Sequence, residues 1–217
     1  MRKLRLGVMI SGSGTNLQAL IDACASDTFP AVIEVVISNR PDAKGLDRAR
    51  DAGIKAVCLD HKTYDDRPAF EDAIHECLSD HKVQLVCLAG FMRLLGANFV
   101  GRWKDRMINI HPSLLPSYKG LHTHARALED GVKFAGCTIH YVRPEMDNGP
   151  IIMQAAIPIA PDETEESLIA KTLSYEHRMY PAAVKLIAEG KVRVSGNKVA
   201  VMEDVELPEA GLVSPVP

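Results

Sequence analysis

The chain has 217 residues, of which 47% are hydrophobic and 24% are charged, a composition typical of a globular protein with a substantial core. The formal net charge of -3 gives no general attraction to nucleic acid or to an anionic membrane, so we expect a small-molecule partner. No apolar run approaches the ~20 residues of a membrane span, and the first residues lead directly into a predicted strand, so we expect a cytoplasmic protein.

The first half of the chain alternates short apolar segments with amphipathic ones. The spacing predicts strands at residues 4–10, 32–37, 56–59 and 85–89, and helices near residues 16–25, 43–52 and 68–80. Continuous apolar strands separated by helices predict a parallel sheet that is covered on both faces. The predicted fold class is therefore α/β, a Rossmann-like, doubly wound, mostly parallel sheet in a single domain.

The second half follows a different pattern. Short apolar strands are predicted at residues 107–110, 137–142 and 151–157, separated by loops rich in Pro, Gly and His rather than by regular helices. A long helix near residues 164–189, capped by Thr164, and a hairpin with strands at 192–195 and 199–202 follow. We therefore expect one domain at residues 1–203, with halves at 1–105 and 106–203, and a loose tail at 204–217.

Cysteine usage indicates a reduced protein. The five cysteines are odd in number, widely spaced and mostly inside apolar stretches, so a disulfide framework is not expected. The sequence contains no Cys-x-x-Cys pair, so a metal site would have to be built from histidines alone.

A glycine-rich turn, Gly12-Ser13-Gly14-Thr15-Asn16, lies between the first predicted strand and the first predicted helix. Backbone amides and a helix N-terminus at this place attract a phosphate, although a tight turn that only needs glycine flexibility has the same pattern. A dinucleotide fingerprint would need glycine in place of Leu17 and an acidic residue in place of Asn39, and an ATP-binding loop would need a Gly-Lys-Ser/Thr ending. The turn favours the phosphate of a small metabolite.

Two polar residues, Asn109 and His111, stand two positions apart at the end of an apolar strand, so their side chains point to the same face. An amide can hydrogen-bond an oxyanion, and an imidazole can stabilise that charge or move a proton, so the pair suits acyl transfer. The same pattern is also typical of strand-end residues that satisfy loop backbone.

Asp147 lies in the loop at residues 144–150, between two apolar strands. An aspartate at this position can orient His111 and favour its charged form if the strands bring the two together. Taken alone, its Asn-Gly-Pro context is typical of a turn residue.

Four histidines, His111, His122, His124 and His140, raise the question of a zinc site. A His-x-His pair without Cys, Asp or Glu at ligand spacing is not specific for metal. Loop positioning is the favoured interpretation of the His122 and His124 pair, and we expect no metal.

Several separated motifs occur in a characteristic order: Ser11 to Leu17, Leu88 to Arg93, Asn109 to Pro116, Gly120 to His124, and Gly136 to Ile152. In order and spacing they resemble, from about Leu6 to Gly190, the phosphoribosylglycinamide formyltransferase family of folate-dependent enzymes. One departure is Asn148, which stands where many relatives carry glycine and bears on the geometry of the folate loop.

The resemblance implies roles for particular residues of this sequence. It implies an acceptor site at Gly14, Thr15, Asn16 and Glu176, of which the first three hold the phosphoribosyl part. It implies a catalytic set of Asn109, His111 and Asp147. The implied folate-binding positions are Arg67, Met92, Arg93, Leu94, Leu95 and Asn109.

The resemblance also implies the reaction. A formyl group would pass from 10-formyltetrahydrofolate, the cosubstrate, to the amine of glycinamide ribonucleotide in purine synthesis. The alternatives are a formyltetrahydrofolate hydrolase, a formyltransferase for another amine and, least favoured, a nucleotide-binding module without catalysis. Nucleic acid and membrane are not expected as partners, and the oligomeric state, including a homodimer, stays open.

Overall fold

The computed structural model describes residues 3–202 and residue 205. Its main sheet has seven strands in the order β3-β2-β1-β4-β5-β6-β7. Strands β1 to β5 run parallel, whereas β6 is antiparallel to both of its neighbours. The strands are β1 (Leu4–Ile10), β2 (Ala31–Ser38), β3 (Lys55–Cys58), β4 (Leu85–Leu88), β5 (Met107–His111), β6 (Phe134–Tyr141) and β7 (Ile151–Pro158). The predicted Rossmann-like, mostly parallel α/β sheet is confirmed.

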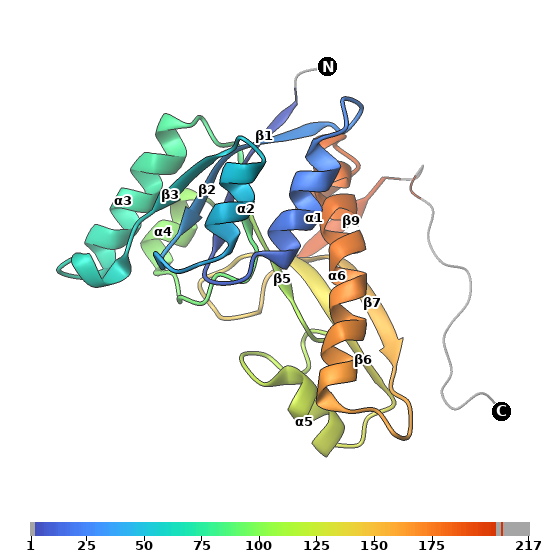
Figure 1. Cartoon of the computed structure of the whole chain (residues 1–217). Helices are drawn as coiled ribbons and strands as arrows, with labels where there is room; N and C mark the ends of the chain where they lie inside the picture. The colour runs from blue at the N-terminus through green and yellow to red at the C-terminus, as the bar shows by residue number, and fades with distance from the viewer. Residues whose placement is uncertain (1–2, 203–204, 206–217) are drawn as a thin grey trace.

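Helices cover both faces of this sheet (Figure 1). One face packs against α1, α2 and α6 in one apolar cluster, and the other packs against α3 and α4 in a second. Side chains alternate between the clusters, with Val8 in the first and Met9 in the second, as the period of a strand requires. The helices are α1 (Thr15–Cys24), α2 (Gly45–Asp51), α3 (Arg67–Asp80), α4 (Ala97–Arg102), α5 (Thr123–Glu129) and α6 (Glu165–Ala188).

Three short helical segments were not predicted from the sequence. They are α4, α5 and the 3₁₀ helix η1 at His61–Thr63. The expectation that only loops separate the strands after residue 107 is wrong for α5, because Thr123–Glu129 forms a regular α-helix. With only seven residues, α5 is too short to show a clear helical period, and its packing against α6 supports it instead.

The C-terminal part of the described chain follows the prediction closely. Thr164 caps α6 through a reciprocal capping box with Ser167. The hairpin of β8 (Val192–Ser195) and β9 (Lys198–Val201) forms a separate two-stranded sheet. The predicted loose tail at 204–217 lies outside the described residues, apart from residue 205.

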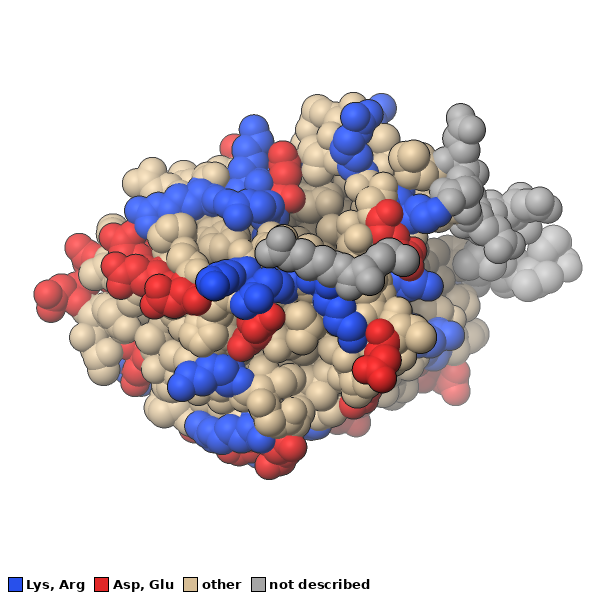
Figure 2. All heavy atoms as spheres, turned by 90° about the horizontal axis from the view of Figure 1, so that it is seen from above, with Lys and Arg blue, Asp and Glu red and all other residues tan. Residues whose placement is uncertain are grey.

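The described surface carries charges of both signs. Figure 2 shows basic and acidic side chains interspersed over the face seen from above. None of the described helices combines the length and the apolar character that a membrane crossing needs.

Candidate active site

A cavity of about 590 Å³ lies at the carboxyl ends of the parallel strands. In an open α/β sheet this edge is where ligands bind. Five of the seven exposed large apolar side chains in the described part of the chain line the cavity, namely Met92, Leu94, Leu121, Met146 and Ile169. Apolar side chains gathered at one cavity suit a ligand with an apolar part.

Strands β5 and β6 build the polar wall of the cavity. Ile108 and Ile139 pack into the apolar cluster that contains α6, whereas Asn109, His111 and His140 line the cavity. The alternation of a strand explains this division, because neighbouring residues point to opposite faces. The prediction that Asn109 and His111 share a face is confirmed.

His111 is buried between two hydrogen-bond acceptors. Its Nε2 lies 3.0 Å from the backbone oxygen of Tyr118, and its Nδ1 lies 3.5 Å from Oδ2 of Asp147. A carbonyl and a carboxylate both accept hydrogen bonds, so each ring nitrogen can carry a hydrogen in this geometry. The structure thus brings Asp147 to His111, as the sequence analysis proposed.

Asp147 is also a turn residue. Its φ of 49° lies in the left-handed region, which aspartate tolerates better than most residues. The backbone N–H of Gly120 donates to its Oδ2 over 2.9 Å. Asp147 is therefore a left-handed turn residue whose carboxylate faces His111.

On the other wall of the cavity, Asn16 of α1 donates from Nδ2 to Oε2 of Glu176 over 2.7 Å. Glu176 is only 5% exposed, and burial raises the pKa of its carboxyl group, while the hydrogen bond from Asn16 acts in the opposite direction. This pair joins two residues that are far apart in the sequence and were expected at the same subsite.

The glycine turn needs glycine for two reasons. Gly14 has a φ of 71°, and a Cβ atom there would lie 2.7 Å from Cα of Gly45 at the start of α2. Thr15 begins α1 directly after this turn, so the start of α1 is held in place by contact with α2. Gly14 and Thr15 lie next to Asn16 in the chain, but neither lines the large cavity.

The expected folate-binding residues fall into two groups. Met92, Arg93, Leu94 and Leu95 line the cavity together with Asn109. Arg67 instead borders a separate hollow beside α3 and α4, where its Nε lies 3.7 Å from Oε1 of Glu71. The structure therefore brings all of this group together except Arg67.

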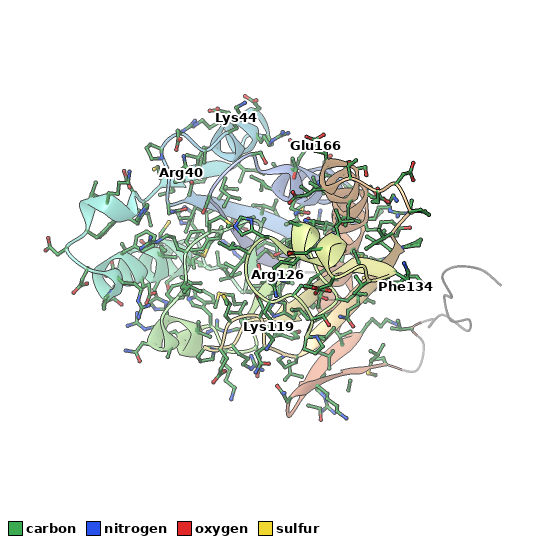
Figure 3. The ribbon with its side chains drawn as sticks, turned by 90° about the horizontal axis from the view of Figure 1, so that it is seen from below. Arg40, Lys44, Lys119, Arg126, Phe134 and Glu166 are labelled. Carbon is green, nitrogen blue, oxygen red and sulfur yellow. The ribbon has the colours of Figure 1, made fainter. Side chains whose placement is uncertain are left out.

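Two loops close over the polar wall and contact each other. Lys119 donates from Nζ to Oδ1 of Asn148 over 2.7 Å. Figure 3, seen from below, shows Lys119 and Arg126 toward the centre of the view and Arg40 and Lys44 beside α2. Because a glycine at position 148 would have no side chain to accept this bond, Asn148 adds a link between the two loops.

Sequence comparison places this architecture among known proteins. A family profile described as formyl transferase matches residues 4–184. The chain belongs to the formyltransferase family. It is 48% identical to a glycinamide ribonucleotide transformylase 1 of Symbiobacterium toebii, whose solved structure matches with a TM-score of 0.90 over 93% of this chain and 95% of the other.

Curated relatives agree with this family. The phosphoribosylglycinamide formyltransferase of Escherichia coli (strain K12) is 41% identical, over 96% of this chain and 98% of its own length. The trifunctional purine biosynthetic protein adenosine-3 of Bos taurus is 46% identical over 90% of this chain. The chain spans only 19% of the length of that trifunctional protein.

Several cavity residues of this formyltransferase were not singled out for a substrate role from the sequence. They are His124, His140, Met146, Ile169, Thr172 and Leu173. Met146 and Ile169 carried a usable signal, since each is a large apolar residue in a polar segment. His124 and His140 were considered only as metal ligands, and the described residues contain no group of three or more His, Cys, Asp or Glu side chains placed to hold a metal.

Proposed function

We propose that this protein transfers the formyl group of 10-formyltetrahydrofolate to the amine of glycinamide ribonucleotide, giving formylglycinamide ribonucleotide and tetrahydrofolate in purine synthesis. The observation that carries the proposal is the convergence of Asn109, His111 and Asp147 on one cavity at the carboxyl edge of the sheet. The names of the relatives over nearly full length support the same reaction.

In the proposed reaction, the acceptor amine attacks the formyl carbon and a tetrahedral intermediate forms with negative charge on oxygen. Asn109 donates a hydrogen bond to that oxygen, and the positive charge of protonated His111 stabilises it. The bond from the formyl carbon to the folate nitrogen then breaks, its electron pair stays on that nitrogen, and a proton from the attacking amine ends there. His111, oriented by Asp147, or an ordered water beside Asp147 carries that proton.

The two substrates enter from different walls of the cavity. Asn16 and Glu176 hold the acceptor, with the phosphate at the turn of Gly14 and Thr15, where the start of α1 attracts an anion. The folate ring lies against Met92 and Leu94, which are apolar and exposed. Arg67, outside the cavity, contacts the part of the folate that extends beyond it.

In this proposal the formyltransferase domain spans residues 1–203, its substrates are two small molecules, and it acts in the cytoplasm, with a homodimer possible. The net charge of -3 gives no general attraction to nucleic acid and so agrees with small-molecule substrates.

An assay with purified protein, 10-formyltetrahydrofolate and glycinamide ribonucleotide, without added metal, tests the proposal. We expect one tetrahydrofolate released for each acceptor formylated, and little release when the acceptor is omitted. Equal release with and without the acceptor would identify a hydrolase. A higher kcat/KM for a different amine would identify a formyltransferase with another acceptor.

A further inference from the structure

His140 stands directly opposite Asn109 in the sheet. The two residues are partners in the antiparallel register of β5 and β6, and both line the cavity. Cross-strand partners on one face lie close enough for their side chains to interact. The register against β7 shifts between Ile139 and His140, an irregularity of the kind that re-aims a side chain beside a site.

A backbone carbonyl group fixes the tautomer of the His140 imidazole. Its Nδ1 lies 3.0 Å from the backbone oxygen of Tyr141, and a carbonyl oxygen can only accept. His140 is only 2% exposed, and burial lowers the pKa of its imidazole. The ring is therefore neutral at physiological pH, with a hydrogen on Nδ1 and a lone pair on Nε2.

This lone pair faces the amide of Asn109. Nε2 of His140 lies 3.4 Å from Nδ2 of Asn109 and 3.8 Å from Oδ1 of Asp147. A lone pair is repelled by the carboxylate of Asp147 and attracted by an amide hydrogen, so Asn109 must turn its nitrogen, not its oxygen, toward the ring. One amide hydrogen is then used by His140, and the second stays available to the substrate oxygen.

We infer that His140 is a positioning residue, which acts through Asn109 by holding the donor face of its amide toward the reacting oxygen. The inference rests on the proposed formyl transfer, in which Asn109 is an oxyanion donor. Without the lone pair of His140, the amide can rotate and present its own oxygen to the developing negative charge. That orientation removes a donor and adds a repulsion, and both effects fall on the transition state rather than on substrate binding.

Two substitutions, by Asn and by Gln, test the roles of the two ring nitrogens of His140 separately. In His140→Asn, the shorter amide can still donate to the Tyr141 oxygen, as Nδ1 does, but it places no acceptor near Asn109. In His140→Gln, the longer side chain puts an amide oxygen close to the position of Nε2, so the acceptor is kept. We expect kcat of His140→Asn to fall about tenfold or more, since one lost oxyanion donor costs ~100- to 1000-fold. KM should stay nearly constant, and His140→Gln should recover most of the rate.

A double-mutant cycle with Asn109→Ala distinguishes positioning from a direct or merely structural role. If His140 acts through Asn109, adding His140→Asn to Asn109→Ala should lower kcat by no more than about twofold further. Multiplicative losses in the double variant, or equal losses in His140→Asn and His140→Gln, would overturn the inference.

A measurement on the unsubstituted protein tests the inference independently of activity and of the folding of the variants. Nitrogen-15 NMR of the unsubstituted protein should show His140 with a hydrogen on Nδ1 and none on Nε2 at neutral pH. A hydrogen on Nε2 would overturn the inference, whatever the variants do. Absence of formyl transfer in the unsubstituted protein would instead contradict the proposed function, so the two failures are distinguishable.

Discussion

Strands β5 and β6 carry opposite chemistry on their two faces. They present Ile108 and Ile139 to the apolar cluster that contains α6, and Asn109, His111 and His140 to the cavity. The strands continue one uninterrupted sheet, so the backbone is the same for both faces. Successive residues of the same strands therefore serve stability and chemistry in turn. Substitutions on one face should mainly change the free energy of unfolding, and substitutions on the other should mainly change kcat.

The largest expected effect is on the cavity face, in His111→Gln. Glutamine can still donate to the Tyr118 oxygen, which now accepts from Nε2 of His111, but it cannot move a proton at neutral pH. We expect kcat to fall by about 100- to 10,000-fold, the usual range for a lost acid–base group, with little change in thermal unfolding. Steady-state kinetics and calorimetry measure both. A kcat within about threefold of the unsubstituted enzyme would remove His111 from the proton path.

On the face that packs in the cluster with α6, a substitution should lower stability and leave kcat nearly unchanged. Ile139→Ala deletes a fully buried side chain from the cluster with α6, and such truncations cost about 2–5 kcal/mol of unfolding free energy. Urea unfolding measures this loss, and kcat at a temperature where the variant is folded should stay within about threefold. A variant that unfolds normally but loses its rate would break the division between the faces.

Glu176 does not fit this division, because it is an acidic residue at a buried position of α6 and also lines the cavity. Burial raises its pKa in the folded state above the unfolded value of about 4.3. Folding therefore favours the protonated carboxyl group of Glu176. Its contribution to the free energy of unfolding is fully present below the unfolded pKa and is lost as the pH rises through the folded pKa. We expect Glu176→Gln to be more stable than the unsubstituted protein at neutral pH, with a difference that narrows as the pH falls.

Urea unfolding over a pH series measures this difference, and acceptor KM measures its functional counterpart. KM should rise in Glu176→Gln, because the carboxyl group of Glu176 is proposed to hold the acceptor. A stability difference that does not change with pH would show that the charge of Glu176 is not the cause.

The smallest expected effect concerns the bond between Lys119 and Asn148. Both residues belong to surface loops, so the bond should contribute about 0.5–1.5 kcal/mol to loop ordering. Lys119→Met and Asn148→Gly should each raise the folate KM a few-fold, and the double variant should resemble either single one. Additive effects in this cycle would show that the two residues act on the loops independently.

Much of the fold follows from local pattern. Apolar runs of strand length, the helical spacing between them and the cap at Thr164 predicted the seven strands of the main sheet and helices α1, α2, α3 and α6 to within three residues at each end. Helices α4 and α5 were not predicted, because such short helices depend on packing more than on a local pattern.

For the site, the sequence by itself determined that Asn109 and His111 point to one face, because a strand alternates with period two. It also placed a glycine-rich turn before α1, whereas the left-handed conformation of Gly14 and its close approach to Gly45 are seen only in the structure. Only the tertiary structure decided that Asp147 reaches His111, that Asn16 meets Glu176 and that His140 faces Asn109. These contacts depend on strand register and helix packing between segments 31 to 160 residues apart, which no local pattern encodes.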